Sequence, residues 1–439
     1  MEEHSELLKA TYHTLGCKLN FAETSAIRKN LESQAIFSAL PHELPDLCIV
    51  NTCSVTATAD KKAKHLIRSL ARRYPEAAIV VTGCYAQLKP EEAASLPGVE
   101  IVVGAPQKNL LPQIIADWRK NRVKKIEAAP AKDINTFTPS CERGERTRFF
   151  LKVQDGCNYY CTYCTIPYAR GHSRSGRIDE MVALAGDAVR RGGKEIVITG
   201  VNVGEFGKDH DETFFDLIRR LDEVRGIERF RISSIEPNLL TEEIIRWIAT
   251  DSRAFMPHFH IPLQSGSDKV LSLMKRRYDT KLFASRIEII RELIPEAFIG
   301  VDIIAGARGE TPAEWERSLE FANNLDITKF HVFPYSERPG TRALQLGDIV
   351  TTEEKHRRVK ILTDLSDKKL NKFMKSAQGK EANVLWETCS EGRMTGHTEN
   401  FLPVEASLKE DLLQDISRVR LTEIDPKNPD IIMGVHLQR

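Results

Sequence analysis

The sequence predicts an α/β protein in three parts: an N-terminal parallel α/β domain, a central partial (β/α)6 barrel and a small all-β C-terminal module. Two observations predict this arrangement. Short apolar runs alternate with helical patterns through most of the 439 residues, and from about residue 375 the pattern changes to β-like runs separated by glycine and polar turns. Such alternation is typical of parallel sheets covered by helices. The chain is also too long for one ordinary domain.

The N-terminal part is predicted over residues 8–122 and has four apolar runs with helical patterns between them. We interpret as strands the residues 11–16, 47–50, 78–82 and 100–103. Strands that alternate with helices are expected to form a small parallel sheet. A polar, proline-containing segment at about 124–146 is predicted to be a linker.

The central part is predicted over residues 143–373 and has six more apolar runs: Phe149–Val153, Glu195–Thr199, Phe230–Ser233, His258–Leu263, Phe298–Ile304 and Lys329–Phe333. Six β–α units in series indicate an open parallel barrel, because a closed one usually takes eight. The chemistry of such folds lies at the carboxyl ends of the strands. The runs ANVLWE, FLPVEA and ISRVRLTEI within 375–439 predict the all-β module.

The composition is that of a globular protein, with 41% hydrophobic and 28% charged residues and a net charge of +1. No apolar stretch is long enough to span a bilayer, and the acidic N-terminus has no apolar core typical of a secretory signal. We therefore expect a cytoplasmic protein without a membrane partner. Nine cysteines argue against a disulfide framework and for thiol or metal chemistry in a reducing compartment.

Cys157, Cys161 and Cys164 stand in DGCNYYCTYC, directly after the first predicted barrel strand. Their spacing lets one loop place three thiolates around a single metal centre. A structural zinc site normally takes four ligands, and no second C-x-x-C or close histidine pair completes such a set. A redox C-x-x-C would leave Cys157 unused. Three thiolates on a [4Fe–4S] cluster leave one iron open, and the spacing favours this interpretation over zinc or redox chemistry.

A second set of cysteines is spread over the N-terminal part. Cys17 follows the first predicted strand, Cys53 the second and Cys84 the third. The carboxyl ends of parallel strands meet at one edge of a sheet, so the fold is expected to gather these thiols around a second open-site cluster. A lone cysteine is usually a small buried residue. The other three are interpreted in that way, as packing or spectator thiols: Cys48, Cys141 and Cys389.

Five segments resemble the methylthiotransferases, a radical S-adenosylmethionine (SAM) family. They are TLGCKLNFAET, NTCSVTATAD, TGCYAQ, DGCNYYCTYCTIPYARG and HIPLQSGSDKVLSLMKRRY, and the likeness covers nearly the whole chain. The resemblance implies a methylthiotransferase N-terminal domain, a radical SAM core and a C-terminal TRAM module. It also implies two [4Fe–4S] clusters, an auxiliary one on Cys17, Cys53 and Cys84 and a radical SAM cluster on Cys157, Cys161 and Cys164.

Further residues are candidates for binding SAM or lining the substrate cavity. Tyr163 lies inside the cysteine loop, where it can pack on the adenine of SAM or simply pack the loop. The others fall at barrel-strand ends, where the alternative is a role in loop backbone structure: Gly200, Asn202, Ser234, Glu236 and Gln264. The chain departs from the family at Gly306–Thr311, where Gly-Ala-Arg-Gly-Glu-Thr replaces the usual Gly-Phe-Pro-Gly-Glu-Thr. Arg308 there is either a substrate contact or solvent-exposed.

Three substrates compete within the family: tRNA adenosine with a threonylcarbamoyl group, tRNA adenosine with an isopentenyl group, and a ribosomal-protein aspartate. The motif Gly16–Asn20, with its Lys-Leu-Asn form, is most similar to the threonylcarbamoyl type. This implies conversion of N6-threonylcarbamoyladenosine at tRNA position 37 to its 2-methylthio derivative. An arginine could hold the carboxylate of that group. The candidates are Arg170, Arg174, Arg177, Arg276–Arg277 and Arg338.

The implied partners are a tRNA and an electron donor of the flavodoxin or ferredoxin type, with no stable protein partner inferred. Six cations between Lys61 and Arg73 lie on one face of a predicted helix. This face is either simply solvated or contacts phosphates. Lys355–Lys360 is a second basic cluster. Residues 375–439 hold eight basic and eleven acidic side chains, so any tRNA contact there must come from one face, such as Arg418 and Arg420.

As a hypothesis, the auxiliary cluster carries the sulfur, and one SAM methylates it. A second SAM yields the radical, which takes hydrogen from C2 of the target adenosine. That adenosine is extruded from its stack. Two rival classes remain: a plain iron–sulfur electron carrier or sensor, which would not consume SAM, and a non-enzymatic RNA-binding protein with structural zinc.

Overall fold

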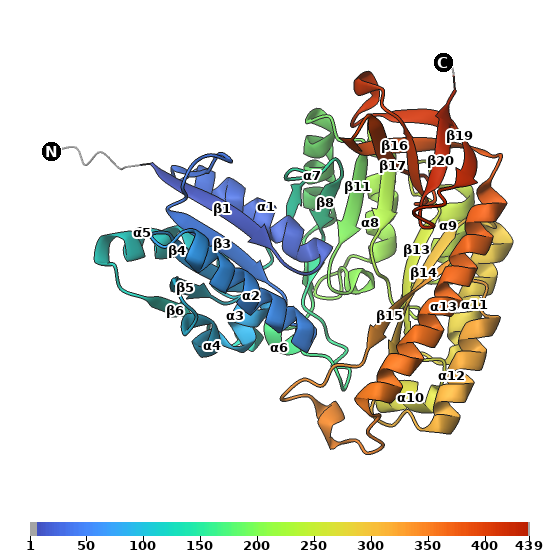
Figure 1. The fold of residues 1–439 in the computed structure, drawn as a ribbon, viewed down its shortest axis with the longest axis horizontal. Helices are drawn as coiled ribbons and strands as arrows, with labels where there is room; N and C mark the ends of the chain where they lie inside the picture. Colours follow the sequence, from blue (N-terminus) through green and yellow to red (C-terminus); the bar gives the residue numbers. More distant parts are fainter. Residues whose placement is uncertain (1–6, 438–439) are drawn as a thin grey trace.

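The structure is a computed structural model that describes residues 7–437. Residues 1–6 and 438–439, which include part of the acidic N-terminus and the end of the predicted C-terminal module, lie outside the described range. Figure 1 shows an N-terminal sheet on the left, a larger parallel sheet with its helices on the right, and a small β barrel above the latter.

The N-terminal part is a six-stranded parallel sheet in the order β2-β1-β3-β4-β5-β6. The central strands β3 and β4 are buried throughout, which explains why they are continuous apolar runs in the sequence. The strands are β1 (Leu8–Thr14), β2 (Ile36–Ser38), β3 (Leu47–Thr52), β4 (Ala78–Gly83), β5 (Val99–Val103) and β6 (Lys125–Glu127). The helices are α1 (Lys18–Glu32), α2 (Ala57–Arg73), α3 (Cys84–Leu88), α4 (Pro90–Ala94) and α5 (Leu111–Asn121).

The central part is an open parallel barrel of six strands with one antiparallel edge strand. Two sheets, β7-β8-β11-β12 and β13-β14-β15, are joined by the isolated parallel bridges Phe230–Phe255 and Ser234–His260. The strands are β7 (Ser140–Glu142), β8 (Phe149–Lys152), β11 (Glu195–Thr199), β12 (Arg229–Ile232), β13 (His258–Gln264), β14 (Phe298–Ala305) and β15 (Lys329–Pro334), with β9 (Gln154–Asp155) and β10 (Arg174–Ser175) pairing separately. The six predicted barrel strands are confirmed.

The helices of the barrel cover its outer face and enclose the largest apolar core of the chain. They are α7 (Ile178–Arg190), α8 (Phe214–Asp222), α9 (Glu242–Thr250), α10 (Asp268–Leu273), α11 (Thr280–Leu293), α12 (Pro312–Asn324) and α13 (Thr352–Ala377). The short helix α6 (Ile166–Arg170) follows the cysteine loop and contacts α3 of the N-terminal part. Short 3-10 turns occur at Lys108–Leu110, Ala131–Asp133, Val203–Glu205, Arg342–Gln345 and Glu410–Leu412. No helix among the residues described is both long and apolar enough to cross a membrane.

The C-terminal part is a closed five-stranded barrel in the order β16-β17-β18-β20-β19. Its strands are β16 (Glu381–Ser390), β17 (Arg393–Thr398), β18 (Pro403–Ser407), β19 (Ile416–Ile424) and β20 (Ile432–His436). It docks at the N-terminal ends of the central strands, where the Arg231 guanidinium donates to the carbonyls of Thr398 and Glu399 at 2.9 and 2.7 Å. This small barrel therefore lies at the end of the central barrel opposite the one where the cysteine loop begins.

The predicted linker at 124–146 is partly wrong, because it contains β6, which extends the N-terminal sheet, and β7, which pairs antiparallel with β8. Both strands are three residues long, and β6 is largely exposed at an edge, so neither leaves an apolar run in the sequence. The strands β2, β17 and β20 are also additions to the predicted set. The domain boundaries at 8–122, 143–373 and 375–439 stay a prediction.

Candidate active site

The carboxyl ends of β1, β3 and β4 meet at one edge of the N-terminal sheet. In the parallel register Thr14 lies opposite Asn51, and Thr52 opposite Gly83. Cys53 and Cys84 directly follow β3 and β4, and Cys17 is the N-cap of α1 just beyond β1. The topology thus brings the three predicted residues to one edge.

Two glycines allow these strand ends to approach closely. Gly16 has a φ of +105°, and a Cβ there would lie 2.6 Å from Cβ of Cys53. Gly83 has a φ of +95°, and a Cβ there would lie 2.3 Å from the carbonyl oxygen of Thr52. Any side chain at either position would force Cys53 away from its neighbours, because these distances are far shorter than a van der Waals contact.

Burial and neighbouring thiols shift the ionisation of Cys53 and Cys84. Burial, together with the neighbouring Cys84 and Cys17, raises the pKa of Cys53 to about 11. Burial also raises the pKa of Cys84, against the opposing charge of Arg170. Thiols of this kind are not free nucleophiles at neutral pH, but a metal that binds thiolates would remove their protons. The donor set fits a metal centre.

The loop from Cys157 to Cys164 forms the second trio, and backbone hydrogen bonds shape it. The amide of Cys157 donates to the Gly171 carbonyl at 3.1 Å, and that of Cys164 donates to the Cys161 carbonyl at 3.0 Å. Three donors point at the sulfurs: the Tyr159 amide at 3.4 Å from Cys157, the Arg276 guanidinium at 3.1 Å from Cys161, and the Ile166 amide at 3.5 Å from Cys164. Donors aimed at sulfur stabilise the thiolates that a cluster requires.

The two trios lie beside each other, because the residues that follow them are in contact. The Thr165 hydroxyl, next to Cys164, donates to the carbonyl of Ser54, next to Cys53, at 3.5 Å. The Arg338 guanidinium binds the Ser54 hydroxyl at 2.7 Å and the Asp60 carboxylate at 2.9 Å. The N-terminal sheet and the barrel thus meet where the two cysteine sets end.

A buried ionic network also joins the N-terminal part to the barrel. Arg170, which ends α6, donates to Glu23 and Asp155 at 2.9 Å each and to the Asn20 amide oxygen at 2.6 Å. Lys152 completes the network with bonds to the same two carboxylates at 3.1 and 2.8 Å. These cations hold the pKa of both carboxyl groups well below their usual range despite burial. A cavity of about 460 Å³ between α1 and the segment 134–142 borders this network and is lined by none of the six cysteines.

The predicted SAM contacts are gathered at the ends of β11, β12 and β13. The Gln154 amide oxygen accepts from the backbone amides of Val201 and Asn202 at 3.0 and 2.9 Å, which anchors the loop after Gly200 beside the cysteine loop. The side chain of Asn202 is buried, and neither of its polar atoms forms a hydrogen bond within the described residues. Buried polar groups normally have a partner, so this side chain is suited to bind a ligand. Ser234 and Gln264 are half-buried, and Gln264 has a φ of +67°.

Glu236 and Tyr163 are bound within the protein. The Glu236 carboxylate pairs with Arg276, which also bonds Cys161, so this predicted contact is linked directly to the cysteine loop. Tyr163 packs with Val270, Met274 and Tyr335 in a small apolar cluster, which is the loop-packing alternative.

The expected substrate-binding arginines are mostly engaged elsewhere. Arg170 and Arg338 are buried in the interdomain contacts, and Arg276 is bound to Glu236. Arg174 bonds three backbone carbonyls and Asp155, Arg277 stacks on Tyr159, and Arg308 pairs with Glu337. The sequence indicates Arg170, Arg174, Arg276, Arg277 and Arg338 as candidates for a carboxylate ligand, but sequence position does not reveal the partners that they have in the fold.

Lys18 stands in the quoted motif next to Cys17, and the sequence does not reveal its surroundings. It begins α1 and is half-buried, and its side chain forms no hydrogen bond or ion pair with any residue that the structure describes. Burial, together with Arg148 and Arg231, lowers the pKa of Lys18 to about 8. The amine is therefore still mostly protonated at neutral pH.

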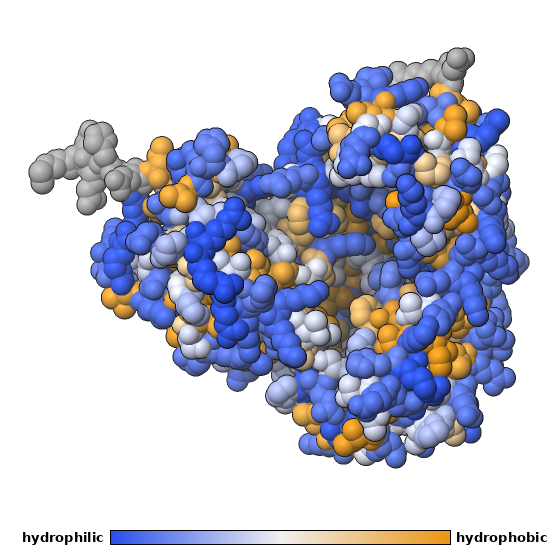
Figure 2. Space-filling view, in the orientation of Figure 1, coloured by the Kyte–Doolittle hydropathy of each residue, from blue (hydrophilic) through white to orange (hydrophobic). Residues whose placement is uncertain are grey.

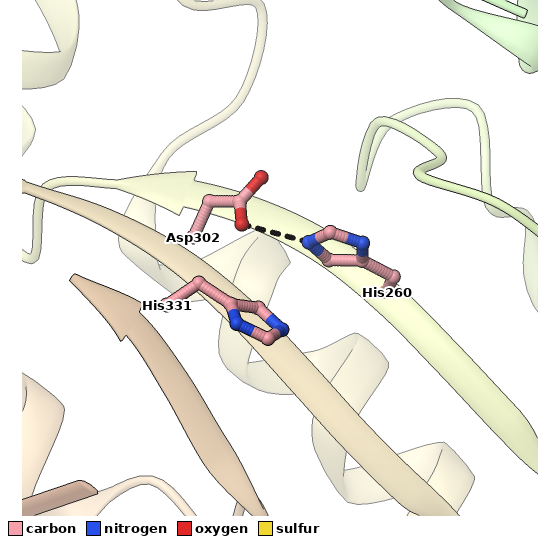
Figure 3. A group of neighbouring side chains, drawn as sticks. All are labelled: His260, Asp302 and His331. Atoms are coloured by element: carbon pink, nitrogen blue, oxygen red, sulfur yellow. Dashed lines mark hydrogen bonds and ion pairs between the residues drawn. The ribbon is translucent and has the colours of Figure 1, made fainter. Parts of the chain in front are cut away.

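Three polar side chains face one another on neighbouring barrel strands, as Figure 3 shows. His260 of β13 bonds Asp302 of β14 at 2.7 Å, and the ring of His331 of β15 lies 5.0 Å from that of His260. Their ligand-type atoms all lie within 4.8 Å of one another. Burial and the neighbouring His260 lower the pKa of His331 to about 4, so this imidazole is neutral. The sequence feature that could have indicated this group is Asp302, a charged residue within the apolar run FIGVDIIA.

Comparisons with known proteins agree with this geometry. The model of the radical SAM superfamily matches residues 151–322, and that of the uncharacterized protein family UPF0004 matches residues 9–104. Among solved structures, the radical SAM methyltransferase TsrM from Kitasatospora setae aligns with a TM-score of 0.58 at 13% identity, covering 88% of this chain and 80% of that one. This likeness concerns the fold. The fold and the cysteine loop define a radical SAM enzyme.

Relatives of known activity show to which family of radical SAM enzymes the chain belongs. The chain is 36% identical to the threonylcarbamoyladenosine tRNA methylthiotransferase MtaB of Bacillus subtilis, over 93% of each chain. It is 36% identical to the MtaB of Thermotoga maritima, over 89% of this chain and 90% of that one. It is 31% identical to the tRNA-2-methylthio-N(6)-dimethylallyladenosine synthase of Syntrophomonas wolfei, over 96% and 97%. The chain belongs to the radical SAM methylthiotransferase family, as its motifs indicated.

Proposed function

We propose that this enzyme places a methylthio group on C2 of N6-threonylcarbamoyladenosine in tRNA. The observation that carries the proposal is the contact between the two cysteine trios through Thr165 and Ser54. Methylthiolation needs a radical source and a sulfur source at one substrate atom, and two adjacent trios can provide both. The relatives named for threonylcarbamoyladenosine support the substrate.

Two [4Fe–4S] clusters and SAM are the cofactors that the six cysteines would serve. Cys157, Cys161 and Cys164 would hold the cluster on which SAM is reduced, and Cys17, Cys53 and Cys84 the auxiliary one. When bound, these groups supply a hydrogen-abstracting radical and the methylthio sulfur. The residues proposed to hold SAM are Tyr163, Gly200, Asn202, Ser234, Glu236 and Gln264.

The chain's own residues position these groups. Arg276 holds Glu236 against the cysteine loop, and Gln154 fixes the backbone of the Gly200–Asn202 turn. The unbonded amide of Asn202 offers a donor and an acceptor to a bound nucleoside. Figure 2 shows a hollow between the N-terminal part and the barrel, with apolar side chains in its depth, into which an extruded base could enter.

Helix α2 is the best candidate for contacts to tRNA phosphates. Its buried face is apolar apart from Asp60, and its exposed cations Lys61, Lys62, Arg68 and Arg72 form no ion pair with a described residue. Unpaired exposed cations are what phosphate contacts require. The other basic positions are less suited, because Arg357, Arg358 and Lys360 pair with acids and Arg418 and Arg420 pair with Glu381. We further propose a cytoplasmic location and a flavodoxin- or ferredoxin-type electron donor.

The test uses the anaerobic, iron-loaded protein with a reductant, SAM and an anticodon stem–loop RNA that carries N6-threonylcarbamoyladenosine. Mass spectrometry of the nucleosides should detect the 2-methylthio product, and 5′-deoxyadenosine should accumulate. A protein that acted only on the isopentenyl RNA would contradict the substrate, and one that released no 5′-deoxyadenosine would be an electron carrier or a binding protein instead.

A further inference from the structure

His260, Asp302 and His331 form a group on the inner face of the barrel that the two cysteine trios do not use (Figure 3). They stand on the neighbouring strands β13, β14 and β15, and Asp302 lies opposite His331 in the register. Residues next to them, such as Ile261 and Val301, are buried in the apolar core under the helices. Because side chains alternate along a strand, the group points the other way, into the barrel.

The donor atoms of this group lie close enough together to share one metal ion. Nε2 of His260 lies 2.7 Å from Oδ1 of Asp302, and one ligand-type atom of each of the three residues lies within 4.8 Å of the others. Ligands around a zinc ion are about 3.3 Å apart, given bonds of about 2.0–2.1 Å. Small side-chain rotations are enough to reach this spacing.

The backbone and the solvent leave these donors accessible. A Cβ at Gly300 would lie 3.2 Å from Nε2 of His331, so the glycine lets that imidazole lie over β14 toward His260. The imidazole of His331 forms no hydrogen bond with any residue that the structure describes. The side chains of His260 and Asp302 are 22% and 20% exposed, so an ion from solution can reach them.

The kind of donor indicates the kind of ion. Two imidazoles and one carboxylate suit zinc, ferrous iron and related divalent ions, whereas iron–sulfur clusters take thiolates. Three protein ligands leave at least one coordination position open, as in catalytic zinc sites. Lys329, two residues before His331, is paired with Asp430 at 3.4 Å, which offsets its repulsion of a cation.

The open position would face the proposed substrate chamber. Ser234, one of the proposed SAM contacts, forms a bridge with His260, and Gln264 ends the same strand. Most of the arginines expected to hold the threonylcarbamoyl carboxylate are bound elsewhere, among them Arg276 and Arg338. That carboxylate therefore needs another positively charged partner.

We propose that His260, Asp302 and His331 bind one divalent metal ion and that the open position of this ion takes the carboxylate of the threonylcarbamoyl substituent. The ion turns a negatively charged group into a positively charged one, so the group attracts a carboxylate that Asp302 alone would repel. The metal site rests on the geometry of the three residues, whereas its substrate ligand rests on the proposed function.

The first experiment measures zinc bound by the anaerobic protein with both clusters in place. After dialysis against zinc and removal of the excess, zinc and iron are determined together. The wild type should hold about one zinc per chain at unchanged iron content, which shows that the cysteines still carry iron. Asp302→Asn and His331→Ala should each bind zinc at least about 100-fold more weakly. His356→Ala, at an exposed histidine of α13, is the matched control and should keep the zinc.

Two results would overturn the metal site: a wild type that holds no zinc, or variants that bind zinc as tightly as the wild type. Zinc-edge X-ray absorption of the wild type needs no variant. It should show nitrogen and oxygen neighbours at about 2.0–2.1 Å, with the scattering of imidazole. Sulfur neighbours at about 2.3 Å would assign the zinc to cysteines and contradict the inference even if the variants failed to fold.

The second experiment tests the substrate ligand with the free nucleoside N6-threonylcarbamoyladenosine. Because coupling between two bound ligands is reciprocal, the saturating nucleoside should lower the Kd for zinc about tenfold, and its methyl ester should change it little. An unchanged Kd would show that the ion does not bind the carboxylate. Zinc binding requires no turnover, so a protein that binds zinc in this way but forms no methylthio product would refute the proposed function and not the metal site.

Discussion

The loop from Cys157 to Cys164 brings its three thiols together by local chain geometry, whereas Cys17, Cys53 and Cys84 come from three separate strand ends. The loop is shaped by backbone hydrogen bonds and by donors aimed at its sulfurs. The dispersed trio depends instead on the register of β1, β3 and β4 and on the glycines at their ends. The first set should therefore tolerate disturbance of the N-terminal sheet, and the second should not.

The largest effect is expected from removing each trio as a whole. Replacing Cys157, Cys161 and Cys164 by alanine should abolish both 5′-deoxyadenosine formation and the methylthio product, because SAM would lose its reducing cluster. Replacing Cys17, Cys53 and Cys84 should abolish only the methylthio product. Nucleoside mass spectrometry on both triple variants measures this, and a methylthio product from the second variant would refute the division of roles.

Breaking the ionic network between the two parts should cost the most stability. Arg170→Met leaves Glu23 and Asp155 buried with one cation fewer, which should lower the free energy of unfolding by about 3–5 kcal/mol. Arg190→Met, at an arginine that is 71% exposed and paired with Asp187, is the control and should change it little. Thermal unfolding under anaerobic conditions measures both. Equal midpoints for the two variants would mean that the network does not hold the parts together.

A smaller effect, confined to the dispersed trio, is expected from Gly83→Ala. The positive φ and the contact with the Thr52 carbonyl should cost about 1–3 kcal/mol and displace Cys84 from Cys53. Iron bound by the N-terminal trio should fall while SAM cleavage by the loop trio continues. Gly347→Ala is the control, since no atom lies within 4 Å of the added Cβ. Unchanged iron content in Gly83→Ala would show that the trio does not need this close approach.

The smallest effect is expected at the contact between the trios. Thr165→Val removes the hydroxyl that reaches the Ser54 carbonyl at 3.5 Å and keeps the shape of the side chain. A bond of this length should contribute about 0.5 kcal/mol or less. The ratio of 5′-deoxyadenosine to methylthio product should therefore rise slightly. A variant with a much larger loss would indicate that this contact sets the distance between the sites.

The clearest sequence signals of the fold come from strands buried on both faces. β3, β4 and the barrel strands have continuous apolar runs because helices cover both sides or the strands enclose a core. The strands β2 and β6 lie at the edges of the N-terminal sheet and are three residues long with exposed positions, so their sequences carry no such run. The family and the fold class are confirmed by the relatives and the structure.

The sequence predicted only those parts of the site that depend on the position of a residue along the chain. The spacing of Cys157, Cys161 and Cys164 and the strand ends before Cys17, Cys53 and Cys84 were visible in the chain. The bonds from Arg170 to Glu23 and Asn20 and from Arg338 to Ser54 join residues 147 to 284 positions apart and depend on how the two parts dock.

The measurement that tests the two-centre account most directly is the iron and sulfide content of the anaerobically prepared protein and its two triple variants. The account predicts about eight iron atoms per chain in the wild type and about four in each variant, since each trio would hold one four-iron cluster independently. A wild type with about four iron atoms, or a variant in which loss of one trio empties the other, would contradict it.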